Sequence, residues 1–111
     1  MRGKPGQLSV HATGAAADIG YPDRATGVAM WDWFIANTAA LGICEIHDYS
    51  FGKYGRGYRC SRGEGTKGVK VYANEAESAG SGGAWLHIEL DPKMAADAVA
   101  FEAAWRSLPK P

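Results

Sequence analysis

The stretch SVHATGAAAD, residues 9–18, contains the features around which the rest of the chain is organised. His11 and Asp18 lie seven positions apart, whereas neighbours on one helix face lie three or four positions apart. The spacing favours two short extended segments joined by a tight turn, with His11 leaving the first and Asp18 entering the second. Gly14 allows a positive φ in that turn, and the alanines after it permit close approach. The pattern therefore predicts that one imidazole and one carboxylate meet.

A catalytic zinc site usually has three protein ligands and one open position, so a third ligand is needed. Among the three histidines of the chain, His87 lies in the apolar run WLHIEL, residues 85–90, which predicts a buried strand. Residues two apart on a strand share a face, so His87 and Glu89 are expected to point the same way. We therefore predict a Zn²⁺ ion held by His11, Asp18 and His87, with the Glu89 carboxylate beside it.

Both motifs resemble those of a known family. Residues 9–18 fit the pattern Ser-x-His-x-x-Gly-x-Ala-x-Asp at every fixed position, and His-x-Glu-Leu follows at residues 87–90. These motifs are similar to the zinc-binding motifs of the D-alanyl-D-alanine carboxypeptidase/dipeptidase family. That family includes the vancomycin-resistance D-Ala-D-Ala peptidases and many phage endolysin domains. The resemblance brackets residues 9–90, most of the chain.

The resemblance implies a zinc metallopeptidase that hydrolyses a peptide bond in a peptidoglycan stem peptide. A bound Zn²⁺ would polarise the scissile carbonyl and lower the pKa of its water. The cut at D-Ala-D-Ala and the cut at an L-Ala-D-amino-acid junction both remain open. The chain would act at the cell wall, as a monomer or as a module of a larger lysin. Residues 1–7 are basic but have no apolar core after them, so no secretory signal is expected and release as a phage lysin is one route.

The family carries its catalytic Glu or Asp three residues before the last histidine, and this chain has Ala84 there. Either Glu89 is the general base, or the acid comes from another segment, or the chain is inactive. An inactive chain would be a zinc-containing module that binds cell wall or another protein. An engineered acid-to-alanine change would give the same sequence. We take Glu89 as the catalytic candidate. If Ala84 marks a lost acid, we expect weak or absent activity, with Glu89 steadying the site.

Residues 49–68 are rich in glycine and lack an apolar period, which predicts a long functional loop. The loop carries three arginines that are candidates for binding a substrate carboxylate with paired hydrogen bonds: Arg56, Arg59 and Arg62. A solvated, mobile connector is the alternative interpretation. Ser9, the first fixed position of the motif, is a further candidate substrate contact. His47 is expected to be a strand or rim residue that can meet a substrate carbonyl.

The composition fits one small globular domain over residues 1–111, with 46% hydrophobic and 22% charged residues. Twelve basic and twelve acidic residues give a formal net charge of zero, which argues against a nucleic-acid partner or a membrane surface. The apolar runs are too short to span a membrane. Cys44 and Cys60 do not form a close Cys-x-x-Cys pair, so we expect free thiols and no cysteine zinc site.

The expected fold is α+β: a small, mainly antiparallel sheet with the zinc site, one helix after the first zinc motif and one C-terminal helix. The first helix is expected over residues 24–41, with Gly42 as its C-terminal cap and its aromatic side chains in the core rather than stacked on a sugar. Asp91 is expected to cap the last helix, which ends before Pro109. The expected extended segments are residues 8–11, 16–19, 43–47, 69–72 and 85–90.

Overall fold

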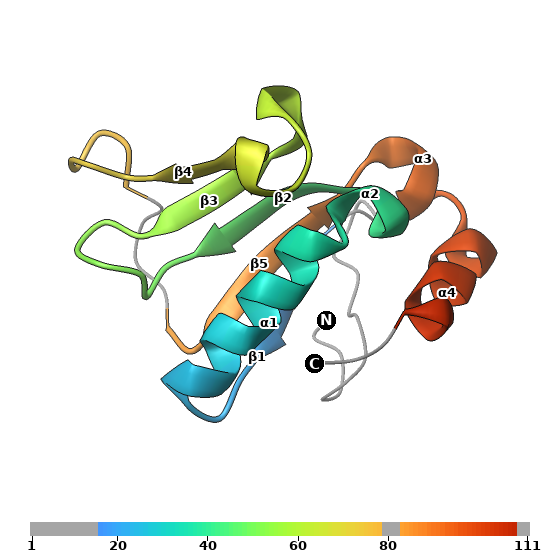
Figure 1. The fold of residues 1–111 in the computed structure, drawn as a ribbon, viewed down its shortest axis with the longest axis horizontal. Helices are drawn as coiled ribbons and strands as arrows, with labels where there is room; N and C mark the ends of the chain where they lie inside the picture. Colours follow the sequence, from blue (N-terminus) through green and yellow to red (C-terminus); the bar gives the residue numbers. More distant parts are fainter. Residues whose placement is uncertain (1–15, 79–82, 109–111) are drawn as a thin grey trace.

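The computed structural model describes residues 16–78 and 83–108. They contain a five-stranded antiparallel sheet in the order β1-β5-β2-β3-β4 (Figure 1). The strands are β1 Ala16–Gly20, β2 Ile43–Asp48, β3 Arg56–Arg59, β4 Val69–Val71 and β5 Trp85–Leu90. The late strand β5 lies between β1 and β2, so it joins the start of the described chain to its middle. The α+β class and the antiparallel sheet are therefore confirmed.

The first predicted helix is present but divided. Helix α1, Arg24–Ala36, starts after Asp23, whose side chain caps it, and covers one face of the sheet (Figure 1). A one-residue break at Asn37 separates it from the short helix α2, Thr38–Leu41. Gly42 follows with a φ of 65°, a conformation that favours glycine, so the predicted C-terminal cap is confirmed.

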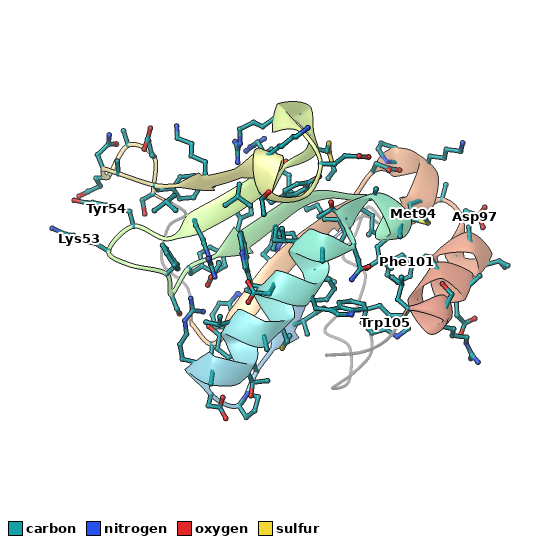
Figure 2. All side chains as sticks on the ribbon, viewed as in Figure 1. Lys53, Tyr54, Met94, Asp97, Phe101 and Trp105 are labelled. Atoms are coloured by element: carbon teal, nitrogen blue, oxygen red, sulfur yellow. A yellow bond between two sulfur atoms is a disulfide. The ribbon has the colours of Figure 1, made fainter. Side chains whose placement is uncertain are left out.

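The C-terminal helix is divided as well. Asp91 caps α3, Pro92–Ala95, as predicted. The side chain of Asp97 then accepts a backbone hydrogen bond and starts a second helix, α4, Ala98–Ser107. Trp105 of α4 points back toward α1 (Figure 2). None of the helices in the described ranges is long and apolar enough to cross a bilayer.

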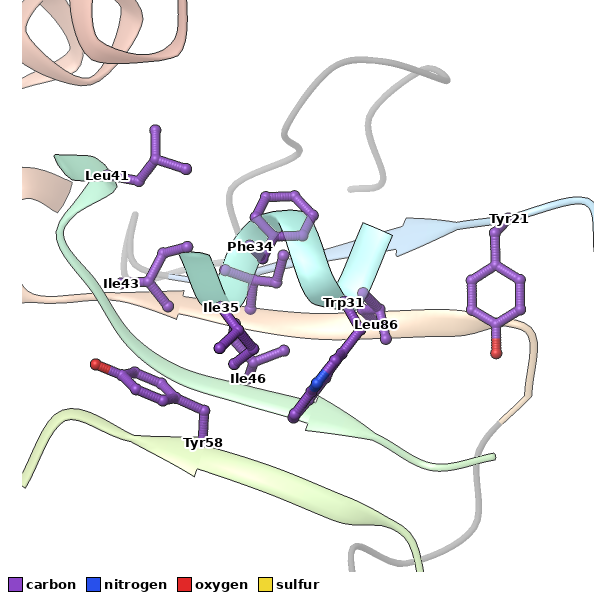
Figure 3. Packing of buried hydrophobic residues seen from close by; sticks show 10 residues of the cluster. Tyr21, Trp31, Phe34, Ile35, Leu41, Ile43, Ile46, Tyr58 and Leu86 are labelled. Carbon is purple, nitrogen blue, oxygen red and sulfur yellow. The ribbon is translucent and has the colours of Figure 1, made fainter. Parts of the chain in front are cut away.

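The hydrophobic core lies between α1 and the side of the sheet that faces it (Figure 3). Its buried members are Tyr21, Trp31, Phe34, Ile35, Leu41, Ile43, Ile46, Tyr58, Leu86 and Ile88. The aromatic side chains of α1 thus pack in the core, as predicted. Because side chains alternate along a strand, the residues between these core positions project from the opposite face of the sheet.

A β-bulge explains the irregular apolar pattern of β2. Ile43 and Ile46 are both buried although they lie three positions apart, and the pairing with β5 shifts between Ile43 and Glu45. The extra residue is Cys44. Bulges of this kind occur next to functional sites, where they re-aim side chains. Here the bulge places the side chains of Glu45 and His47 on the face of the sheet away from α1.

Cys44 and Cys60 form a disulfide, with Cα atoms 4.7 Å apart, so the expectation of free thiols is wrong. The pairing of β2 with β3 places Glu45 opposite Arg59, and this register brings the two neighbouring cysteines together. The sequence did not reveal the pair because β3 was not recognised as a strand.

Residues 49–68 are more ordered than the predicted loop. They contain β3 and two 3-10 turns, η1 at Cys60–Arg62 and η2 at Gly65–Gly68. Strand β3 reads RGYR, with one apolar side chain, so no alternation marks it in the sequence. Tertiary pairing with β2 decides its conformation instead. A Cβ at Gly57 would overlap the end of the Tyr72 side chain, so any larger residue there would require that side chain to move.

Removal of the disulfide is expected to lower the free energy of unfolding by about 3 kcal/mol, the chain-entropy value for closing a loop of about 15 residues. The sequence separation of Cys44 and Cys60 is 16 residues. Urea unfolding of Cys60→Ala against wild type measures the loss. Reductant should destabilise the wild type by a similar amount and leave the variant unchanged. Equal stability of both proteins in the absence of reductant would contradict the assignment.

Candidate metal site and its surroundings

The face of the sheet opposite α1 carries two neighbouring rows of polar side chains. One row of register partners crosses β1, β5 and β2 and consists of Asp18, His87 and His47. The next row crosses β5, β2 and β3 and consists of Glu89, Glu45 and Arg59. Four strands therefore bring together two imidazoles, three carboxylates and one guanidinium from distant parts of the chain.

Both ring nitrogens of His87 face a carboxylate. Nδ1 lies 2.8 Å from Asp18 Oδ1, and Nε2 lies 2.9 Å from Glu89 Oε2. The side chains of Asp18 and His87 are 18% and 20% exposed. Burial is the largest single influence on the pKa of His87 and lowers it, but the hydrogen bonds and charges of Glu89 and Asp18 outweigh burial. The pKa of His87 therefore lies above its ordinary value.

The donor types in this arrangement fit zinc, which binds imidazole nitrogen and carboxylate oxygen. Because Nδ1 of His87 faces Asp18, Nδ1 is the nitrogen that can share a metal ion with that carboxylate. Nε2 would then keep its proton and donate to Glu89. Histidine ligands commonly donate their second N–H to a carboxylate in this way, which fixes the ring and its tautomer.

Two of the three predicted ligands, Asp18 and His87, are thus neighbours. The third, His11, lies outside the described residues, as does the candidate substrate contact Ser9. Within residues 16–78 and 83–108, no group of three or more His, Cys, Asp or Glu side chains is arranged to hold a metal ion.

His47 stands in the centre of the sheet beside His87, with ring centroids 5.7 Å apart. Its Nε2 lies 3.1 Å from Glu45 Oε1, and the other oxygen of Glu45 accepts a 3.3 Å hydrogen bond from Arg59. Its Nδ1 is buried and has no hydrogen-bond partner in the described part of the chain. The predicted place of His47 on a strand is confirmed, and its position is central rather than at a rim.

Aromatic side chains lie beside the two histidines. Tyr49 stacks on His47 at a centroid distance of 6.2 Å, and Trp85 meets Tyr49 edge-on at 6.2 Å. Burial raises the pKa of the Tyr49 hydroxyl, and the negative charges of Asp18 and Glu89 raise it further. The two carboxylates that contact His87 therefore also act on the pKa of Tyr49.

Arg56 points to the other face of the sheet. Its Nε donates to Asp48 Oδ2 at 2.9 Å, and its guanidinium lies over Trp31 at 4.2 Å and Phe51 at 4.1 Å. Only 13% of its side chain is exposed. Arg56 is thus part of the packing between α1 and the sheet, away from His87.

The two remaining arginines also have separate surroundings. Arg62 donates to the backbone carbonyls of Gly68 and Gly57 at 3.0 and 3.1 Å, so it braces the turns after β3. Arg59 is half exposed and lies in the second polar row beside Glu45. The structure therefore does not bring the three arginines together at one substrate-binding surface. Arg59 is the one that shares a face with His87.

Ala84 is exposed at the bend just before β5, and its carbonyl accepts the backbone N–H of Tyr21 at 3.0 Å. The place at which the resembled family carries its catalytic acid therefore offers only a methyl group. Sequence reasoning did not select Glu45 or Tyr49. Their period-two spacing around His47 was the signal that could have found them.

No family model, curated protein or solved structure matches the chain. What the site can do chemically follows from its own donors. It offers an imidazole and a carboxylate in contact, which are donor types that zinc binds, a second carboxylate on the same imidazole, and a second imidazole in contact with a carboxylate of its own.

Proposed function

We propose that the chain is a zinc-dependent peptidase that cuts peptidoglycan stem peptides. The observation that carries the proposal is the approach of Asp18 Oδ1 to His87 Nδ1 at 2.8 Å across a separation of 69 residues. The two residues come from the two motifs that resemble the D-alanyl-D-alanine peptidase family. With His11 they would complete a three-ligand site that leaves one position open.

The chain's own residues would divide the work as follows. His87 would bind through Nδ1, and Glu89 would hold the ring through Nε2 and fix its tautomer. When bound, zinc would polarise the scissile carbonyl and make water nucleophilic near neutral pH. Arg59, which is half exposed beside the site, would be the arginine that binds a substrate carboxylate.

Digestion of purified peptidoglycan by the zinc-loaded protein tests this function. We expect new amino and carboxyl ends in the stem peptides, loss of cleavage with a chelator, and its return with added zinc. Mass spectrometry of the fragments identifies the bond. Full zinc occupancy without any cleavage would contradict the peptidase assignment.

Ala84 favours a second candidate, an inactive zinc-containing module that binds cell wall or another protein. In that case the unaltered chain should bind zinc and cell wall without cutting it. Ala84→Glu, which puts a carboxylate where the family has one, should then create activity. Cleavage by the unaltered chain would exclude this candidate.

Glu89→Gln is expected to weaken zinc binding by about tenfold to 100-fold, because the carboxylate that orients His87 is lost. Saturating zinc should then restore most of the hydrolysis. Competition titration with a chromogenic chelator measures the affinity. Glu102→Gln is the matched control, since Glu102 is exposed on α4 and pairs with Arg106. A 10²-fold loss of hydrolysis with unchanged zinc affinity would instead make Glu89 the general base.

A further inference from the structure

A pocket of about 500 Å³ opens on the α1 side of the sheet, opposite the face that carries His87. Strands β3 and β4 extend past the edge of α1, and together with η2 and the side of α1 they line this pocket (Figure 1). Its volume falls within the range of small-molecule sites, about 300–1,000 Å³. The pocket is therefore a candidate ligand site that is separate from the proposed metal site.

The walls of the pocket are held by the fold itself. Trp31 and Ile35 line it from α1 and are buried, and Val69 lines it from β4. On the η2 side, the backbone N–H of Gly65 donates to the buried hydroxyl of Thr38 at 3.1 Å. The pocket is thus preformed, and its apolar lining suits an aliphatic group.

The guanidinium of Arg56, which also lines the pocket, is fixed on three sides. Trp31 and Phe51 lie against it at 4.2 and 4.1 Å, and its Nε donates to Asp48. Its Nη nitrogens donate to no described residue. They reach solvent, because Nδ1 of His47 is the one buried, unpaired side-chain nitrogen or oxygen in the described part of the chain. Arg56 therefore holds a free outer edge that matches a carboxylate in paired hydrogen bonds.

The charges around the pocket favour a ligand that carries both signs. Arg24 and Arg56 share the single carboxylate of Asp48, so one positive charge stays uncompensated even when Asp48 is ionised. Asp32 lines the pocket from α1, and its carboxylate has no ion pair or hydrogen bond to residues 16–78 or 83–108. The pocket thus offers a guanidinium edge and a carboxylate that are not paired with each other.

We propose that this pocket binds a free α-amino acid with an aliphatic side chain. The ligand carboxylate is held by the outer edge of Arg56, its ammonium group by Asp32, and its side chain by Ile35 and Val69. This site is independent of the proposed peptidase function, because it lies on the opposite face of the sheet from His87.

Isothermal titration calorimetry of the full chain with L-leucine and D-leucine tests the proposal. We expect saturable binding of one leucine per chain for at least one enantiomer. Leucinamide, which lacks the carboxylate, should bind about tenfold to 100-fold more weakly, as expected for loss of a charged hydrogen-bonded contact. N-Acetyl-leucine, which lacks the ammonium group, should bind at least about twofold to fivefold more weakly, because Asp32 is exposed.

Matched variants identify the residues that bind. Arg56→Lys keeps the charge beside Asp48 but loses the planar fork, so we expect about a tenfold or greater loss of leucine affinity. Arg24→Lys is its control, because Arg24 holds the same carboxylate but does not line the pocket. It should bind leucine as wild type does. Asp32→Asn should lose about twofold to fivefold in affinity. His87→Ala should keep wild-type affinity, which separates this pocket from zinc-dependent binding of leucine.

Four results would overturn the proposal. They are no heat of binding for either enantiomer at millimolar concentrations, equal binding of leucine and leucinamide, equal losses in Arg56→Lys and Arg24→Lys, and loss of leucine binding in His87→Ala. Unchanged affinity in Asp32→Asn together with equal binding of N-acetyl-leucine would also overturn it, since the ligand would then be a simple carboxylate. Urea unfolding of each variant shows whether it retains the wild-type fold.

Discussion

Replacing His87 by alanine is expected to abolish stoichiometric zinc binding. Structural zinc sites are worth about 10–16 kcal/mol over their whole ligand set, so losing one of three ligands removes several kcal/mol. That corresponds to at least about a 10³-fold weaker affinity. Elemental analysis after metal reconstitution and gel filtration measures the result. Wild type should retain one zinc per chain.

His47→Ala is the matched control for this experiment, because it removes an imidazole from the neighbouring position of the same row. It should retain zinc at the wild-type level. Undiminished zinc in His87→Ala, or substoichiometric zinc in the reconstituted wild type, would count against the ligand assignment.

Asp48→Ala is expected to lower the free energy of unfolding by about 3–5 kcal/mol, the usual cost of removing one partner from a buried ion pair. The Asp48 side chain is fully buried and accepts two hydrogen bonds from Arg24 at 3.0 Å and one from Arg56 at 2.9 Å. Its loss leaves two guanidinium groups without their acceptor. Chemical denaturation monitored by tryptophan fluorescence measures the change.

Asp32→Ala provides the control, because Asp32 is exposed on α1 and its replacement should change stability by no more than about 0.5 kcal/mol. Asp48→Asn keeps the volume of the side chain and should also destabilise, since it leaves the positive charges uncompensated. An Asp48→Ala protein as stable as Asp32→Ala would contradict the account. Asp48 follows His47 on β2, so this ion cluster also anchors the strand that carries the site.

Local signals in the sequence were enough for several elements. The apolar run of β5 was predicted at its observed bounds, Trp85–Leu90, and Asp91 was recognised as a helix cap. The extended segment carrying Asp18 was predicted over residues 16–19 and extends to Gly20. These features depend on residues close together in the chain, where periodicity and capping chemistry are informative.

Features that depend on pairing between distant segments were not visible. Strand β3 has too little apolar content to be recognised alone, so neither its pairing with β2 nor the disulfide could be inferred. The same is true of Arg56. Charge and loop composition suggested a surface role, but the register places it against Asp48 beneath α1.

The candidate site shows the same division. The sequence placed His87 and Glu89 on one strand face and named Asp18 as a ligand, and the sheet brings these three side chains into contact. It did not reveal that β2 lies beside β5. Without that strand order, His47 could not be seen as a neighbour of His87, nor Glu45 as the group that holds it.

Diffraction from crystals of the zinc-loaded protein, recorded on both sides of the zinc absorption edge, tests the central claim most directly. The account predicts one anomalous peak bonded to His11, Asp18 Oδ1 and His87 Nδ1 at about 2.0–2.2 Å. Glu89 should remain on His87 Nε2. A zinc peak elsewhere or coordination through His87 Nε2 would contradict it. So would the absence of a peak in crystals of protein that carries one zinc per chain in solution.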